Sequence, residues 1–152
     1  PNHGLTQPWR FQVFMDGAAT RLMGALSEAY RLNAGDKAMS SKVEKIKARG
    51  ERCNAIVALG LAHDPGGRFP LWEDQSALAA GVQNMHLMCT AHGIGGYWST
   101  PGFLSHPHAT AALGHPEDVQ GMGLFYLGYP DGDWPAKGHR KPLEYVTNWN
   151  TE

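Results

Sequence analysis

The stretch GVQNMHLMCTAHGIGGYWST, residues 81–100, carries most of what the sequence predicts. It has the composition of an apolar helix with little charge, followed by a glycine-rich break and a Trp-Ser-Thr strand. A helix that is apolar around most of its circumference is expected to be buried on nearly every side. Gly93, Gly95 and Gly96 carry no Cβ, so another group can approach the backbone closely after the helix. The stretch therefore indicates a flat ligand held against an internal helix, and an ordinary helix stop is the alternative.

Length and composition narrow the class of protein. The chain has 152 residues, enough for one domain, and a formal net charge of −1 that gives no electrostatic basis for binding nucleic acid or an anionic membrane. No apolar run approaches the roughly 18–20 residues needed to span a bilayer. The two cysteines, Cys53 and Cys89, have apolar neighbours and form no CxxC motif, so we expect reduced thiols and a cytoplasmic protein.

Three further segments have the pattern of strands. Trp9 to Met15 alternates large apolar and polar residues, which predicts a half-buried strand. Asn54 to Gly60 is a continuous run of small apolar residues and predicts a strand covered on both faces. Gly121 to Gly128 is the last clear strand, and the tail from Tyr129 is predicted to be extended because of its prolines, Pro130, Pro135 and Pro142.

Four segments have the pattern of helices. Asp16 is the predicted N-cap of a helix from about Gly17 to Leu32. The basic residues of 37–50 predict a solvated helix face, and a binding patch is the alternative. The long apolar helix runs from Leu71 to His92, and a short helix covers 106–114. This mixed order predicts one α+β domain over residues 1–152, in which a mixed or antiparallel sheet is flanked by helices and contains a long buried central helix.

The chemistry-bearing residues favour a cofactor over side-chain catalysis. The glycines at Gly93, Gly95 and Gly96 leave a helix at its negative end, whereas a phosphate-binding glycine loop leads into the positive end of a helix. They suit a neutral ring, for which a flavin is the leading candidate. The sequence contains no GxSxG motif and no evident acid–base constellation, which fits an enzyme whose difficult chemistry belongs to a cofactor.

Two weaker patterns leave alternatives open. His106, His108 and His115 would be the ligands of a metal-binding protein, although no set of ligands at zinc spacing is present. Arg140, beside Lys141 in an extended segment, would hold a phosphate through two hydrogen bonds or belong to a solvated charge pair.

Several of these segments together resemble the FMN-dependent nitroreductase family, and within it the small single-domain putative NAD(P)H nitroreductase subgroup. Pro1-Asn-His-Gly-Leu-Thr-Gln-Pro-Trp-Arg-Phe11 is similar to the family's Ala-Pro-(Ser/Asn/Asp)…Gln-Pro-Trp-x-Phe segment. Gly93-Ile-Gly-Gly-Tyr-Trp-Ser-Thr100 is similar to its Gly-(Leu/Phe/Ile)-Gly-(Gly/Ala)-x-Trp-(Arg/Ser)-(Ser/Thr) segment. Phe125 to Pro130 and Arg140 to Leu143 resemble its last strand and tail, so the likeness covers the whole chain in order.

The resemblance implies a homodimer with two FMN molecules at the subunit interface. NAD(P)H would reduce the flavin, and a nitroaromatic, quinone or similar acceptor would oxidise it in a ping-pong reaction. No side chain would carry the hydride chemistry. The residues implied to contact FMN are His3, Gln7, Gly95, Gly96, Trp98, Ser99, Thr100 and Arg140. Loops 33–40 and 63–72 would shape the pocket for the acceptor.

The resemblance leaves other activities open. A flavin dehydrogenase, a dehalogenase or a non-catalytic FMN-binding protein would share the same fold. The family's Arg-Arg-Ser-x-Arg segment, which grips the FMN phosphate, is not found in these 152 residues. We therefore expect an N-terminally truncated chain that binds FMN weakly and lacks part of the dimer interface.

Overall fold

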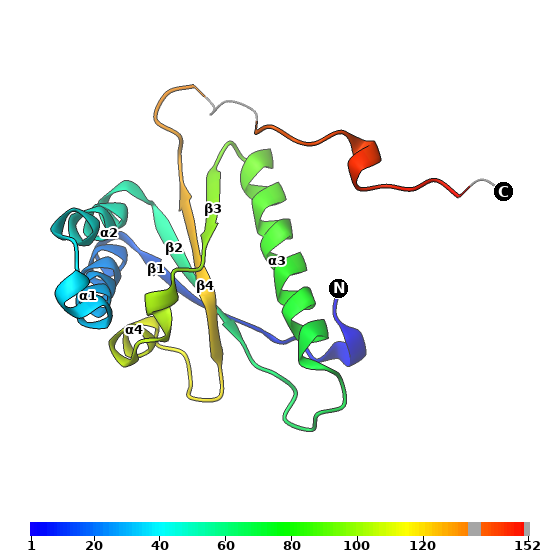
Figure 1. Cartoon of the computed structure of the whole chain (residues 1–152), viewed down its shortest axis with the longest axis horizontal. Helices are drawn as coiled ribbons and strands as arrows, with labels where there is room; N and C mark the ends of the chain where they lie inside the picture. The colour runs from blue at the N-terminus through cyan, green and yellow to red at the C-terminus, as the bar shows by residue number, and fades with distance from the viewer. Residues whose placement is uncertain (134–137, 151–152) are drawn as a thin grey trace.

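The computed structural model describes residues 1–133 and 138–150, and it confirms the predicted α+β fold. Figure 1 shows a central sheet with helices on both sides. The four helices are α1 (Asp16–Ala34), α2 (Ser40–Arg52), α3 (Leu71–Ala91) and α4 (Pro107–Leu113). The four strands are β1 (Trp9–Met15), β2 (Ala55–Leu61), β3 (Gly95–Ser99) and β4 (Gln120–Gly128). Short 3-10 turns lie at His3–Leu5, Gly35–Lys37, Gly102–Ser105 and Leu143–Tyr145.

The sheet is antiparallel throughout, with strand order β1-β2-β4-β3. β1 pairs with β2 so that Trp9 lies opposite Leu61, and β3 pairs with β4 so that Gly95 lies opposite Gly128. β3 therefore forms one edge, and the chain enters it directly from the end of α3. This connection fixes the Gly93–Thr100 segment along this edge of the sheet, next to β4.

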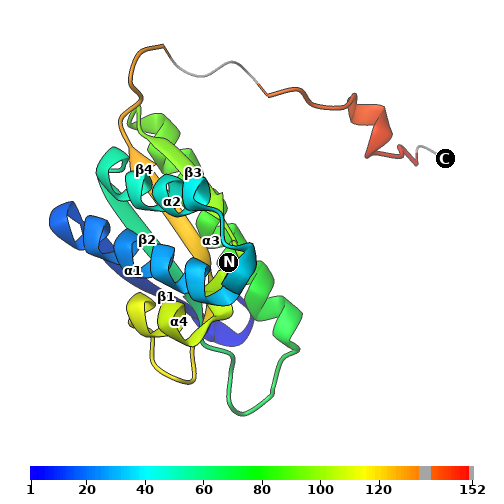
Figure 2. The same cartoon turned by 60° about the vertical axis from the view of Figure 1, so that its left-hand side comes forward.

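Two hydrophobic clusters cover the two faces of the sheet, and Figure 2 shows the helices that form them. On one face, α1, α2 and α4 pack over Ile56, Leu124 and Tyr126. On the other, Val82 and Cys89 of α3 pack over Val57, Leu59 and Phe125. The predicted strand at 54–60 is thus covered on both faces, because alternate residues of β2 enter different clusters.

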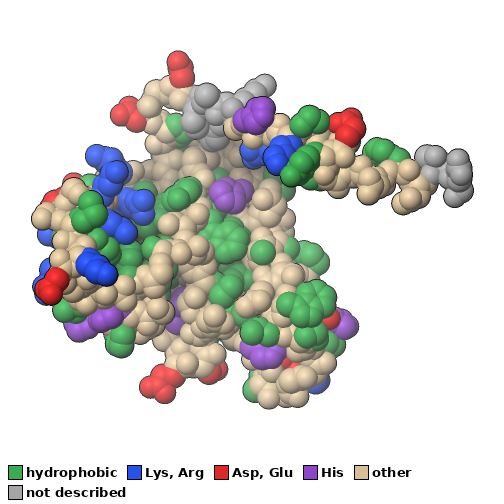
Figure 3. All heavy atoms as spheres, in the orientation of Figure 1, with side chains coloured by type: hydrophobic (Ala, Val, Ile, Leu, Met, Phe, Trp, Pro, Cys, Tyr) green, Lys and Arg blue, Asp and Glu red, His purple; other side chains and the backbone are tan. Residues whose placement is uncertain are grey.

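Helix α3 is buried on one face only within the chain, which corrects the expectation of burial on nearly every side. Its outward face carries Trp72, Leu87 and Met88, which are 63%, 59% and 57% exposed. Figure 3 shows hydrophobic side chains gathered over this helix. The sequence could not distinguish a helix surrounded by its own chain from a helix with an apolar face left open.

Strand β1 is half-buried as predicted, but with the opposite face inward. Phe14 packs against the cluster under α1, whereas Phe11, Val13 and Met15 are 42%, 61% and 55% exposed on the α3 side of the sheet. The reason is that α3 packs mainly along β3, at the other edge. Asp16 is likewise not an N-cap: it is the first residue of α1, has a positive φ of 49°, and caps no backbone amide with its side chain.

The tail after β4 projects away from the sheet in Figure 1 and carries the turn at Leu143–Tyr145. Its described parts fit the predicted extended tail, and Pro135 lies outside the described residues. Within the described part of the chain, none of the helices has the length and apolar character needed to cross a membrane.

Candidate functional site

The residues of β3 that the resemblance implies to contact FMN lie on both faces of the sheet. Side chains of a strand alternate, so Gly96 and Trp98 face one way and Gly95 and Ser99 face the other. Trp98 packs with the cluster under α3, whereas Ser99 lines a cavity beside α2. This division follows from the period of two in the sequence, but which face is open depends on the helices.

On the α3 side of the sheet, Gly96 allows neighbouring side chains to pack closely against the β3 backbone. A Cβ on Gly96 would lie 2.7 Å from Cζ of Phe125 and 3.2 Å from Nδ1 of His86. The rings of His86 and Phe125 meet edge to face, with centroids 4.6 Å apart. Trp98 is half-buried here and donates its indole N–H to the carbonyl oxygen of Met122 at 3.1 Å. This face is therefore filled by side chains.

On the α2 side, Ser99 borders a cavity of about 450 Å³, which we call the basic cavity. Its walls combine cations with apolar groups, from Met39, Ser41, Lys42, Lys45, Ile46, Arg49, Ser99, Pro101 and Phe103. Lys and Arg side chains gather over α2 in Figure 3. The floor is apolar because Ile46 and Phe103 are 4% and 8% exposed. A planar ring with a polar, electron-rich edge matches this combination of walls.

Arg49 is the most buried of the three cations that line the basic cavity. It is half-buried at the end of α2, and its guanidinium carbon lies 5.4 Å from the centroid of the Tyr126 ring. Tyr126 in turn stacks on Tyr97 of β3, with centroids 6.2 Å apart. Burial raises the pKa of Tyr126, although Arg49 opposes that shift, so the phenol stays protonated. The aromatic pair thus holds a fixed positive charge beside the β3 backbone.

Thr100 lines a neighbouring cavity of about 240 Å³, and Pro101 lines both this cavity and the basic cavity. Gly95 lines a third, more open hollow with Tyr97, Tyr126 and Cys53. Gly95, Gly96 and Ser99 of β3 therefore border open space on the described surface, as does Thr100 just after the strand.

The opening segment, residues 3–8, places His3 at the first turn of α3, and neither His3 nor Gln7 lines the basic cavity. Nδ1 of His3 lies 2.6 Å from Oε2 of Glu73, and its ring lies 4.0 Å from that of Phe69. Gln7 is exposed and has a positive φ of 46°. Among the described residues, no hydrogen bond or cavity joins His3 or Gln7 to Ser99 or Thr100 within one chain.

A buried carboxylate, Asp74, lies beneath this segment. It is 2% exposed and accepts hydrogen bonds from Oγ1 of Thr6 at 2.9 Å and from Nδ1 of His63 at 2.7 Å. The amide of Asp64 points to it at 3.4 Å. Burial alone would raise the pKa of Asp74, but the hydrogen bonds from His63 and Thr6 outweigh it, so this pKa lies below its ordinary value. We call Thr6, His63, Asp64 and Asp74 the Asp74 cluster.

Arg140 lies in the projecting tail, apart from both of these regions. Its guanidinium donates to the carbonyl oxygen of His139 at 3.3 Å, and the neighbouring Lys141 lies 3.7 Å from the ring centroid of Tyr145. The contacts of both cations are thus within the tail itself.

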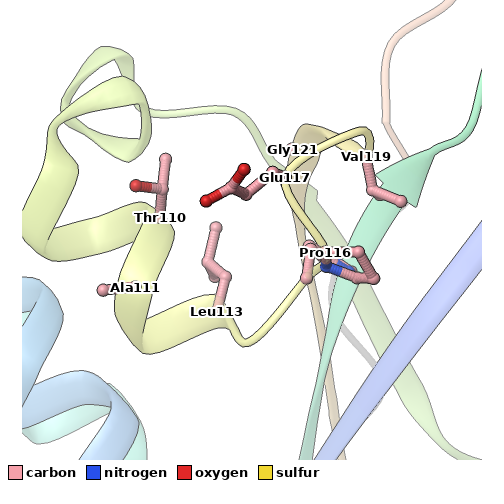
Figure 4. A pocket seen from close by; sticks show the side chains of 8 residues that line it. Thr110, Ala111, Leu113, Pro116, Glu117, Val119 and Gly121 are labelled. Carbon is pink, nitrogen blue, oxygen red and sulfur yellow. The ribbon is translucent and has the colours of Figure 1, made fainter.

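The histidines of the metal hypothesis do not come together. The rings of His106 and His108 are 5.7 Å apart, and no group of three or more His, Cys, Asp and Glu side chains within residues 1–133 and 138–150 could hold a metal ion. His115 instead lines a cavity of about 400 Å³ between α4 and β4, with Thr110 and Glu117 (Figure 4). Its two ring nitrogens are buried without a partner among the described residues, and burial lowers the pKa of His115.

Cys53 and Cys89 are unpaired and lie in the clusters on opposite faces of the sheet. Burial raises the pKa of both thiols, so neither is activated as a nucleophile. The prediction of reduced core thiols fits this placement.

Sequence reasoning missed two features. Lys42, Lys45 and Arg49 lie on one face of α2; Lys42 and Lys45 are exposed as the solvated face predicts, and what the sequence analysis missed is that this face borders a cavity shared with Ser99 of β3. The second feature is the burial of Asp74, an acidic residue at the start of an apolar helix. The signal for it is the pair of hydrogen-bond donors Thr6 and His63, which lie far apart in the sequence.

Comparisons with known proteins point in one direction. The model of the Nitroreductase family matches residues 1–129. The Escherichia coli (strain K12) protein named "Putative NAD(P)H nitroreductase YdjA" is 28% identical over 132 residues, which make up 86% of this chain and 69% of that protein.

Two solved structures share the fold. The nitroreductase-like family protein from Bacillus cereus has a TM-score of 0.77 at 20% identity, covering 100% of this chain and 78% of the other. The FMN-dependent nitroreductase NfnB from Mycobacterium smegmatis, in complex with NADPH, has a TM-score of 0.71 at 18% identity, covering 99% and 82%. Because the family model spans most of the sequence in one continuous match, the chain belongs to the nitroreductase family.

Proposed function

We propose that the chain binds FMN and passes electrons from NAD(P)H through it to nitroaromatic, quinone or similar acceptors by a ping-pong mechanism, as a cytoplasmic homodimer. Family membership supports an oxidoreductase, and the M. smegmatis relative is described as FMN-dependent and bound to NADPH. The observation that carries the proposal is the basic cavity, which sets Arg49 and Lys45 opposite Ser99 over an apolar floor.

The residues of the basic cavity fit the pyrimidine edge of a flavin ring. When bound, FMN supplies the hydride and electron chemistry. Arg49 and Lys45 hold positive charge where that edge would gain electron density, and the water-poor floor of Ile46 and Phe103 strengthens the interaction. The Ser99 hydroxyl is a polar group in the wall of the basic cavity and would orient the ring, and Thr100 borders the neighbouring cavity.

We place the remaining contacts across a subunit interface. His3, Gln7 and Arg140 do not reach the basic cavity within one chain, so in a homodimer a second copy would supply them. The outward face of α3 and the exposed face of β1 form an apolar surface of the kind that marks interfaces. The projecting tail is also apolar, with Leu143, Tyr145, Val146 and Trp149 between 58% and 74% exposed.

Titration of FMN fluorescence against Arg49→Gln tests the cavity. A charge-assisted hydrogen bond is worth about 1.5–3 kcal/mol, so its loss is expected to weaken FMN binding by roughly 10- to 150-fold. Arg31→Gln is the matched control, because Arg31 pairs with Glu28 on the exposed side of α1. Equal FMN affinity in the wild type and Arg49→Gln would refute the assignment of the cavity.

Turnover distinguishes the same-fold alternatives. An oxidoreductase of this type consumes NADPH or NADH steadily when a nitroaromatic or quinone is present. Parallel lines in double-reciprocal plots of the initial rate, at several fixed acceptor concentrations, indicate a ping-pong reaction. An FMN-binding protein without catalytic function consumes none. A dehydrogenase or dehalogenase would ignore this acceptor panel while retaining the flavin spectrum.

A further inference from the structure

Three segments meet at one buried charge, and the first of them is distant in the sequence from the other two. Asp74 belongs to α3, Thr6 to the opening segment, and His63 and Asp64 to the loop that leads from β2 to α3. A buried carboxylate is costly to maintain unless hydrogen bonds compensate for its lost hydration. Here it accepts two short side-chain hydrogen bonds, so its stability depends on keeping these segments together.

The opening segment has a backbone that needs such support. Gly4, Leu5 and Gln7 have positive φ values of 56°, 56° and 46°. Two of these three residues carry a Cβ, and the left-handed conformation costs free energy for them. Strain of this kind persists only where the surrounding contacts determine the conformation. Thr6, between Leu5 and Gln7, is the residue that Asp74 holds.

Neighbouring contacts extend the same attachment. Glu73 contacts His3, so successive residues of α3 hold both ends of the turn. The Phe69 ring lies against Gly4 so closely that a Cβ there would be 2.3 Å from it. Arg68 of the same loop is tied to Asp64 by an ion pair of 2.9 Å. The opening segment and the 62–70 loop are therefore fixed as one unit.

We propose that Asp74 is a positioning residue that holds His3 and Gln7 in place by fastening the strained opening segment to α3 and to the 62–70 loop. The fastening itself stands on the geometry alone. Its consequence for the cofactor rests on the proposed function, because His3 and Gln7 are there assigned to FMN. The buried carboxylate thus links a cofactor-contacting segment to a loop expected to shape the acceptor pocket.

Amide hydrogen exchange of Asp74→Asn measures the fastening directly. The probes are the amides of Thr6, which donates to the His3 carbonyl, and of Ala62, which donates to the Pro8 carbonyl at 2.7 Å. We expect both amides to exchange at least about tenfold faster, while the amides of β2 keep their protection. Asp118→Asn, at an exposed aspartate in the turn before β4, is the matched control and is expected to change neither. Unchanged exchange at Thr6 and Ala62 in folded Asp74→Asn would overturn the proposal.

A second pair of variants guards against misfolding of Asp74→Asn. Thr6→Val keeps the shape of the side chain and removes its donor, whereas Thr6→Ser keeps the donor. Faster exchange of the two probe amides in Thr6→Val, but not in Thr6→Ser, supports the fastening. The same exchange in both variants argues against it.

The affinity for FMN separates this proposal from the proposed function. If the wild type binds FMN, a released opening segment is expected to weaken binding about tenfold in Asp74→Asn, and unchanged affinity with faster exchange would refute the positioning role. If the wild type binds no FMN, the proposed function fails. The exchange data then still decide whether Asp74 fastens the segment.

Discussion

Substitution of Gly96 by alanine is expected to destabilise the folded chain even when no FMN is present. The new Cβ would lie 2.7 Å from Cζ of Phe125, a distance that real Cβ contacts essentially never show. Phe125 is 0% exposed and packs between β2 and α3, so its ring has no free volume into which it could move. His86, the second neighbour at 3.2 Å, is half-buried and able to rotate away.

The expected size follows from the cost of overpacking a core. An extra carbon in a well-packed site costs about 1–3 kcal/mol. For a chain of this length, each kcal/mol corresponds to roughly 2–4 °C in Tm, so the expected decrease in Tm is about 2–12 °C. Gly95→Ala is the matched control, because its Cβ would meet only the Gly128 carbonyl oxygen at 3.3 Å, and a change within about 0.5 kcal/mol is expected.

Urea unfolding followed by circular dichroism, without added flavin, measures both variants. The reasoning predicts a lower midpoint for Gly96→Ala and nearly the wild-type midpoint for Gly95→Ala. If Gly96→Ala were as stable as the wild type and lost only FMN binding, Gly96 would act mainly in the close approach of the ring. That result would refute the packing role assigned here.

Three further outcomes are expected from other parts of the structure. Gly60→Ala should lower the free energy of unfolding by about 1–3 kcal/mol in urea titrations, because its Cβ would lie 2.5 Å from Val119 and 2.8 Å from His115; wild-type stability would contradict the packing there. The pKa of Asp74 is lowered in the folded chain, so the ionised carboxylate stabilises the fold. This contribution to the free energy of unfolding is fully present above the ordinary pKa of 3.8 and is lost as the pH falls through the lower folded pKa. We therefore expect the urea midpoint of Asp74→Asn, measured from pH 2 to 6, to fall less steeply below about pH 4 than that of the wild type. An unchanged slope would contradict an ionised Asp74 in the folded chain. Leu87→Glu should shift a homodimer to monomers in sedimentation velocity because Leu87 is 59% exposed on the apolar face of α3, and an unchanged sedimentation coefficient would place the interface elsewhere.

Local pattern was sufficient for the elements of this chain. The alternation of Trp9 to Met15 matches β1 at both ends, and the apolar run from Leu71 matches α3 to within a residue. Gly93 follows α3 with a positive φ of 67°, as expected of a helix-terminating glycine. These features depend on neighbouring residues alone, because helical and strand periods are properties of the backbone.

The sequence by itself determined the α+β class, the run of helices and strands and the family resemblance. Only the tertiary structure decided which faces are filled. In the folded chain, Phe11 and Val13 point outward and Gly96 packs against the Phe125 ring. Arg49 of α2 lines the same cavity as Ser99 of β3. Asp74 is buried beneath Thr6 and His63. Such pairings join residues tens of positions apart, and they are set by how helices and strands pack, which no local period encodes.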